Sequence, residues 1–172
     1  MKYLTNSFVA FLLFIFLSGC QAQPANGYLE LNQLFQDFAK VIKSENQVEM
    51  KNYLQKILPD DYTIDYLKSN DYSYRNFVEE VEKNPKVLEQ FRVRYLQKMI
   101  RFQTKLKRKK QLEKLVFEKM DNEEIEIIYE PLKIEATESI IYLKHGEDRI
   151  KCKLGELLKI NGVWKCFTGP KF

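Results

Sequence analysis

Hydrophobic residues follow three patterns along this chain of 172 residues. Phe8 to Leu17 is an unbroken apolar run. From Tyr28 to Leu106, apolar residues recur at steps of three and four, the period of an amphipathic helix. From Leu112 onward they alternate more often with polar residues, which is typical of strands. The pattern predicts helices followed by a sheet, the element order of an α+β domain.

Prolines divide the helical part. One helix is predicted over 28–42 and a second over 48–58, where it stops before Pro59. The longest predicted helix begins near Pro85, because proline suits the first helical turn. Its apolar stripe comprises Leu88, Phe91, Tyr95, Met99, Phe102 and Leu106. We expect these amphipathic helices to cover one face of the sheet.

Turn signals divide the strand part. Strands are predicted over 112–120, 125–129, 132–144, 149–160 and 163–168. The turns between them include Asp121 to Glu124, His145 to Asp148, and Asn161-Gly162, a pair that favours a two-residue type I′ hairpin. The apolar side of the strand over 149–160 is predicted to be Ile150, Cys152, Leu154, Leu158 and Ile160. The result is an antiparallel meander.

The last hairpin fixes the expected positions of two cysteines. A two-residue loop at Asn161-Gly162 places Leu157 opposite Cys166, which leaves Cys152 about 16 Å along the strand at ~3.3 Å per residue. A disulfide needs Cα atoms within ~7 Å of each other. We therefore expect two free, buried thiols, unless Gly155 marks a bulge or bend that re-aims the strand.

The apolar run near the start of the chain is too short to span a bilayer. As a helix its ten residues extend ~15 Å, whereas a bilayer core of ~30 Å needs about 20 apolar residues. Lys2 precedes the run and small residues end it, as in a secretory signal peptide.

Leu17-Ser18-Gly19-Cys20 at the end of this run resembles the lipobox of bacterial lipoproteins. The resemblance implies cleavage before Cys20, with acyl chains on its sulfur and usually on its amine. Two or more chains hold a protein firmly on a membrane, whereas one chain binds only marginally. The alternative is an ordinary secretory signal followed by an unrelated cysteine.

The chain then divides into a signal peptide over 1–19, a lipidated cysteine and flexible tether over 20–27, and a single α+β domain over 28–172. The tether lacks the acidic residues that alter lipoprotein sorting, so the predicted location is the bacterial cell envelope, on the outer membrane facing the periplasm if there are two membranes. Lys2 is the only charged residue removed, which leaves 27 basic against 24 acidic residues. This mild excess is not that of a dedicated nucleic-acid binder, and no nucleic acid partner is expected.

Two surface features are candidate binding sites. Tyr62, Tyr66, Tyr72 and Tyr74 lie close in sequence to Asp65, and such rings could line a ligand pocket or simply cover the core where short helices meet. Basic residues gather at the end of the long helix, at Arg101, Lys105, Lys107, Arg108, Lys109 and Lys110. These residues could contact anionic lipid headgroups or the acidic surface of a partner, or they could simply be solvated.

Catalytic motifs are scarce. His145 is the only histidine and lies in a predicted turn, and no glycine-rich phosphate loop or two-histidine zinc helix is present. We expect no cofactor and no metal. Asp65 with Tyr62 or Tyr66 is the one combination that could perform isomerase-like acid-base chemistry.

The order of helices, meander and terminal hairpin with Trp164 is similar to that of the cone-shaped fold of ketosteroid isomerase and nuclear transport factor two. A cystatin-like sheet with added helices is the competing interpretation. The leading hypothesis is a lipid-anchored domain that binds a partner or small ligand without catalysis. The alternative is a cone-fold enzyme acting on a small hydrophobic substrate, which requires a deep cavity with an inward-facing buried carboxylate.

Overall fold

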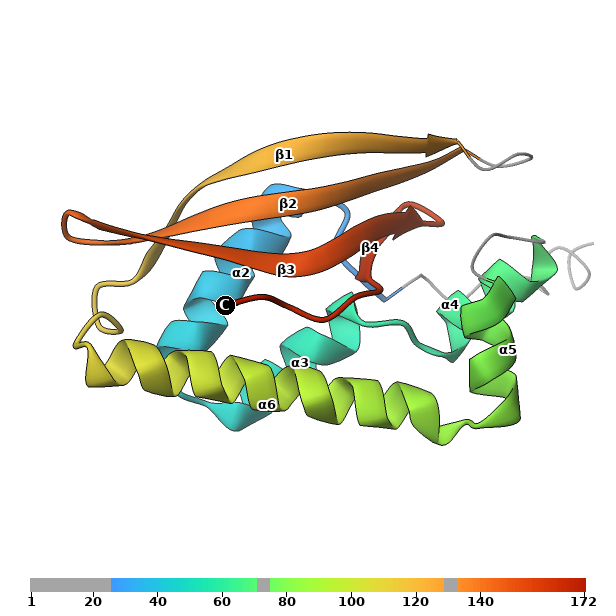
Figure 1. The fold of residues 1–172 in the computed structure, drawn as a ribbon, viewed down its shortest axis with the longest axis horizontal. Coiled ribbons are helices and arrows are strands. Elements are labelled where there is room, and N and C mark those ends of the chain that lie inside the picture. Colours follow the sequence, from blue (N-terminus) through green and yellow to red (C-terminus); the bar gives the residue numbers. More distant parts are fainter. Residues whose placement is uncertain (1–25, 71–74, 129–132) are drawn as a thin grey trace, which may run out of the picture.

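The computed structural model describes residues 26–70, 75–128 and 133–172, and the predicted α+β class is confirmed (Figure 1). Five helices come first in this part of the chain: α2 (Leu31–Ser44), α3 (Gln47–Ile57), α4 (Asp61–Ser69), α5 (Arg75–Lys83) and α6 (Lys86–Arg108). Four strands follow: β1 (Val116–Ile128), β2 (Lys133–His145), β3 (Asp148–Ile160) and β4 (Val163–Cys166). The predicted signal peptide, Cys20, Tyr72 and Tyr74 lie outside the described residues. Within those residues, no helix is long and apolar enough to cross a membrane.

The helix boundaries follow local chemistry. Asn46 caps α3 by accepting a hydrogen bond from the backbone N–H of Val48, and α3 ends just before Leu58 and Pro59. Pro85 occupies the cap position of α6, one residue before the first full turn. The predicted helices over 28–42 and 48–58 and the long helix after Pro85 are therefore confirmed.

The sheet is an antiparallel meander in the order β1-β2-β3-β4. In the last hairpin Ile160 pairs with Val163 and Leu157 with Cys166, which is the register predicted from Asn161-Gly162. Cys152 and Cys166 are both free and buried, as expected.

The predicted turn at Asp121 to Glu124 is wrong, because β1 runs through these residues without interruption. Asp121 pairs with Ile140 and Glu124 with Thr137 in a continuous ladder with β2. Backbone hydrogen bonds form this ladder, and β1 lies at the edge of the sheet, where charged residues are tolerated. Four polar residues in sequence therefore do not break the strand.

A β-bulge at Gly155 changes which side chains face the main core. The pairing shifts from Glu138 opposite Glu156 to Ile140 opposite Lys153, so that Leu154 and Gly155 together lie opposite one residue of β2. The prediction that Leu158 and Ile160 continue the face of Cys152 is therefore wrong. Leu157 continues that face instead, because an extra residue exchanges the two faces of a strand.

Two apolar cores result. The larger lies between the sheet and the helices α2, α3 and α6, and it includes Leu157. The smaller contains residues of α4, α5 and the first turn of α6, packed with Leu158, Ile160 and Phe167. Consecutive residues of β3 enter different cores because successive side chains of a strand point to opposite faces.

The last residues of the chain return along the sheet towards α6. Lys153 and Lys171 exchange two backbone hydrogen bonds of 2.9 Å. Figure 1 shows this segment running between the sheet and α6. Its path places the aromatic ring of Phe172 against the long helix, where the candidate site is found.

Candidate functional site

A surface groove lies between α6 and residues 170–172. Its lining residues are Lys98, Arg101, Phe102, Lys105, Pro170, Lys171 and Phe172, and its volume is about 340 Å³. The Nζ of Lys98 donates a hydrogen bond of 3.2 Å to the backbone oxygen of Pro170, which joins the two walls. Residues about 70 positions apart in sequence thus form one site, which we call the basic groove.

Aromatic rings form the apolar part of the basic groove. The rings of Phe102 and Phe172 are stacked, with centroids 4.5 Å apart and planes inclined by 20°. The ring of Phe172 also stacks on that of Phe38, at 5.7 Å. Phe102 and Phe38 are buried core residues, so the floor of the groove is fixed to the main core.

Positive charge surrounds this floor. Lys98, Arg101 and Lys105 are exposed on α6 at spacings of three and four residues, which places them on one side of the helix. Lys171 adds a cation from the opposite wall. No acidic side chain lines the groove, so it combines four cationic side chains with an aromatic surface.

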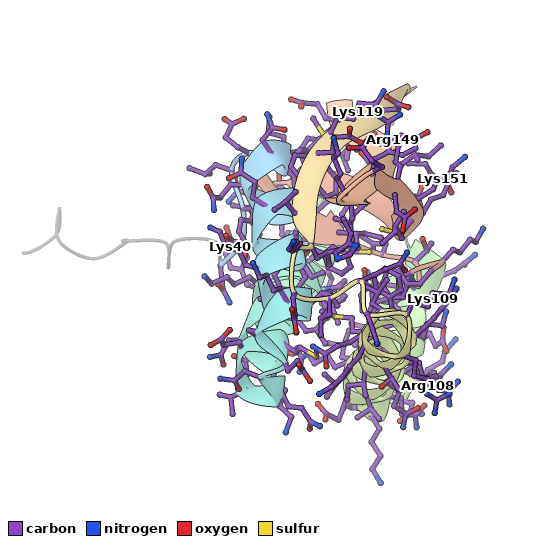
Figure 2. All side chains as sticks on the ribbon, turned by 90° about the vertical axis from the view of Figure 1, so that its left-hand side faces the viewer. Lys40, Arg108, Lys109, Lys119, Arg149 and Lys151 are labelled. Atoms are coloured by element: carbon purple, nitrogen blue, oxygen red, sulfur yellow. The ribbon has the colours of Figure 1, made fainter. Side chains whose placement is uncertain are left out.

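The structure separates the predicted basic residues into two groups. Arg101 and Lys105 line the basic groove. The Nζ of Lys107 pairs instead with the carboxylate of Glu45 at the end of α2. Arg108, Lys109 and Lys110 are exposed where α6 ends, and Figure 2 shows Arg108 and Lys109 at that end.

The predicted tyrosine site is only partly described. Tyr62 and Tyr66 are half-buried on α4, and the amide of Asn161 donates a hydrogen bond to the hydroxyl of Tyr62. The ring of Tyr66 packs against the smaller core. Asp65 is exposed, so it is not the buried carboxylate that the isomerase-like mechanism requires.

Two buried tyrosines occupy the space between the helices and the sheet. Tyr53 on α3 and Tyr95 on α6 are 3% and 1% exposed. The hydroxyl of Tyr95 donates a hydrogen bond of 2.6 Å to the backbone oxygen of Leu154 at the bulge. Burial raises the pKa of both tyrosines well above its ordinary value, so both hydroxyls remain neutral. Tyr53 and Tyr95 are thus core residues.

A buried ion pair was not predicted from sequence. Lys165 on β4 is 1% exposed, and its Nζ donates hydrogen bonds to Asp60 Oδ2 at 2.9 Å and to the Leu58 oxygen at 3.3 Å. Asp60 also caps α4 by accepting from the backbone N–H of Thr63. The only available signal was a lysine inside the apolar segment Val163 to Phe167.

The pKa values of both members of the ion pair are lowered, which favours the charged form of Asp60 and the neutral form of Lys165. Burial favours the neutral acid of Asp60, but hydrogen bonds from Thr63 and Lys165 outweigh it, so the pKa of Asp60 is lowered. Burial lowers the pKa of Lys165, and the hydrogen bond to Asp60 opposes that change only partly. The desolvation cost therefore falls mainly on the lysine, which is the more deeply buried of the two.

A second groove of about 360 Å³ lies between α3 and α6. Its charged lining residues are Lys51, Glu89 and Arg92, so it carries both signs of charge. Arg92 donates to the backbone oxygen of Pro59 at 3.3 Å, but its buried Nε has no partner among the described residues. The mixed charge of this groove gives it less selectivity for anions than the basic groove.

Within residues 26–70, 75–128 and 133–172, no group of three or more His, Cys, Asp or Glu residues is arranged to hold a metal ion. His145 pairs with Asp148 where β2 meets β3. In comparisons with known proteins, no family model, no curated protein and no solved structure matches this chain.

Proposed function

We propose that this chain is a lipid-anchored lipoprotein of the bacterial cell envelope whose α+β domain binds a ligand or partner without catalysis. The anchoring part of the proposal rests on Leu17-Ser18-Gly19-Cys20, which follows an apolar run of signal-peptide length. The proposed location is the outer membrane, facing the periplasm, in an organism with two membranes. The similarity to the cone-shaped fold remains part of the proposal, since in both the main core lies between helices and one face of a curved sheet.

The basic groove is the observation that carries the binding function. It offers four cations beside stacked aromatic rings. These groups suit recognition of an anionic ligand, and their side chains include no thiol, imidazole or carboxylate. We therefore assign the groove to binding.

The alternative is a cone-fold enzyme with a substrate pocket near the tyrosines of α4. It requires a buried, inward-facing carboxylate, whereas Asp65 is exposed and the space under the sheet holds Tyr53, Tyr95 and Met99. The buried polar and charged residues in the described part of the chain are Thr63, Gln103, Thr137, Ser139 and Lys165. Loss of a measured isomerase or hydrolase activity on Asp65→Asn would favour the enzyme instead.

Metabolic labelling tests the anchor. Cells expressing the full chain are fed labelled palmitate, and the label on the protein is compared for the parent, Cys20→Ser and the control Cys152→Ala. We expect label on the parent and on Cys152→Ala, and none on Cys20→Ser, with Cys20→Ser leaving the membrane fraction. Label of equal intensity on Cys20→Ser would contradict the proposal.

A further inference from the structure

Arg101 and Lys105 add charges to the basic groove that are unpaired among the described residues, whereas several other cations of α6 already have a partner. Lys107 is paired with Glu45, Arg92 lies within 4 Å of Glu89, and Lys98 donates to Pro170. Arg101 and Lys105 form no ion pair with any residue that the structure describes, although both lie at the rim of a groove. Their charges are therefore available to an external anion.

The geometry points to one occupant: we propose that the basic groove binds the phosphate headgroup of an anionic phospholipid that remains seated in a membrane. A guanidinium binds phosphate oxygens in pairs, and ammonium groups add positive charge around it. Arg101 would hold the phosphate while Lys105 and Lys171 flank it from the two walls.

The apolar floor determines which kind of phosphate fits. Phe102, Phe172 and Pro170 present ring surfaces beside the cations, and these surfaces suit the glycerol and the first methylenes of a lipid better than a free ion. The volume of about 340 Å³ is near the lower end of ligand cavities, ~300–1,000 Å³. A groove of this size holds a headgroup but not two acyl chains, which therefore stay in the bilayer.

The basic groove lies along one side of α6. The exposed basic residues at the C-terminal end of this helix are close to it. Figure 2 shows Arg108 and Lys109 at that end, and Lys151 on the sheet. These charges would attract an anionic membrane at longer range without holding a phosphate. The inference rests on the proposed function in one respect, because the lipid anchor keeps the domain beside a membrane.

Lysine footprinting in lipid nanodiscs tests the proposal on the full chain. The protein is inserted into discs of phosphatidylglycerol or of phosphatidylcholine with the same acyl chains, treated with an acetylating reagent, and analysed by mass spectrometry. We expect phosphatidylglycerol to slow acetylation of Lys105 and Lys171 roughly threefold or more. Lys86, exposed at the opposite end of α6, is the internal reference, and Lys109 reports on general attraction to the anionic surface.

Two variants that each remove one arginine distinguish binding in the basic groove from general attraction to the anionic surface. Arg101→Gln should abolish the protection of Lys105 and Lys171, whereas Arg108→Gln, outside the groove, should leave it intact. Both residues are exposed, so both variants are expected to keep the circular dichroism spectrum of the parent. Equal protection of Lys109 and Lys105, or equal effects of the two variants, would overturn the proposal.

Phosphatidylcholine discs with added inorganic phosphate or an oligoglutamate peptide identify the source of the anion. Protection of Lys105 by either additive to the level seen with phosphatidylglycerol would overturn the assignment to a membrane lipid. The mass of the N-terminal peptide in the same sample reports acylation of Cys20. A missing acyl group would contradict the proposed anchor. The acetylation pattern would still test whether the basic groove binds a phospholipid headgroup.

Discussion

The ammonium group of Lys165 lies 2.9 Å from the Oδ2 of Asp60, which joins the last strand of the sheet to the first residue before α4. The lysine side chain is 1% exposed and the aspartate side chain 23%. Asp60 thus keeps access to water and to the hydrogen bonds of Thr63, whereas the acceptors of Lys165 among the described residues are Asp60 and the Leu58 oxygen. The charged form of Lys165 therefore depends on Asp60 more than the charged form of Asp60 depends on Lys165.

Removing the aspartate should therefore destabilise the protein more than removing the lysine. Asp60→Asn retains a helix cap but leaves a buried ammonium without a charged partner, for an expected loss of about 2–4 kcal/mol in the free energy of unfolding. Lys165→Met fills a similar volume and leaves a hydrated, capped carboxylate, for an expected loss of no more than about 1.5 kcal/mol. Urea unfolding at pH 7 measures both.

Lys68→Met is the control for the general effect of removing a lysine from an ion pair. Lys68 pairs with Glu82 on the surface, where both side chains are exposed, so its loss should have little effect on the free energy of unfolding. A larger loss in the free energy of unfolding for Lys165→Met than for Asp60→Asn would contradict the greater dependence of Lys165 on Asp60.

The same pair predicts a pH dependence. The folded-state pKa of Asp60 is below its unfolded value, so its contribution to stability is present above the unfolded pKa and is lost as pH falls through the folded pKa. The difference between the parent and Asp60→Asn should therefore shrink below about pH 4. As pH rises towards the unfolded-state pKa of lysine, about 10.4, Asp60→Asn should regain stability, because the folded-state pKa of Lys165 is lowered and deprotonation removes its buried charge. Unfolding curves from pH 3 to about pH 10 measure this, and a constant difference would contradict it.

Gly155 should be intolerant of any side chain. Its φ is +110°, and a Cβ at this position would lie 2.3 Å from the backbone oxygen of Thr168. We expect Gly155→Ala to lower the free energy of unfolding by more than about 2 kcal/mol, from backbone strain together with displacement of the C-terminal segment. Gly146 is the matched control, since its φ is +61° and nothing lies within 4 Å of the added atom. Gly146→Ala should be destabilising by about 1 kcal/mol, and thermal unfolding that ranks the two variants equally would contradict the bulge geometry.

The thiols of Cys152 and Cys166 should be unreactive in the folded protein. Burial raises the pKa of each thiol to about 12, so only about one thiol in 10,000 is ionised at pH 8. In a Cys20→Ser background, an aromatic disulfide reagent should therefore modify neither cysteine at pH 8 and both in urea. Rapid modification of one thiol without denaturant would show that its strand opens locally.

Several features of this fold were predictable because they depend on local sequence. Asn161-Gly162 determines a two-residue turn, and the turn fixes Leu157 opposite Cys166. Pro59 follows the end of α3 and Pro85 precedes the start of α6. Proline has no backbone N–H, so it is tolerated at these positions but not inside a helix. These signals involve neighbouring residues only.

Other features depend on contacts between distant parts of the chain. The basic groove joins Lys98 to Pro170, and only the return of the C-terminal segment along β3 brings them together. The burial of Lys165 depends in the same way on Asp60, which is 105 positions away. Arg101 and Lys105 could be named from sequence, but the aromatic floor beside them could not.

The polar centre of β1 has a further consequence. A thirteen-residue outer strand offers a long row of backbone groups to which a neighbouring molecule can add its own strand. The sequence has three acidic residues in the centre of this strand, Asp121, Glu123 and Glu124, and the same stretch of a second copy would carry charge of the same sign. We therefore expect these three acidic residues to oppose strand-to-strand aggregation.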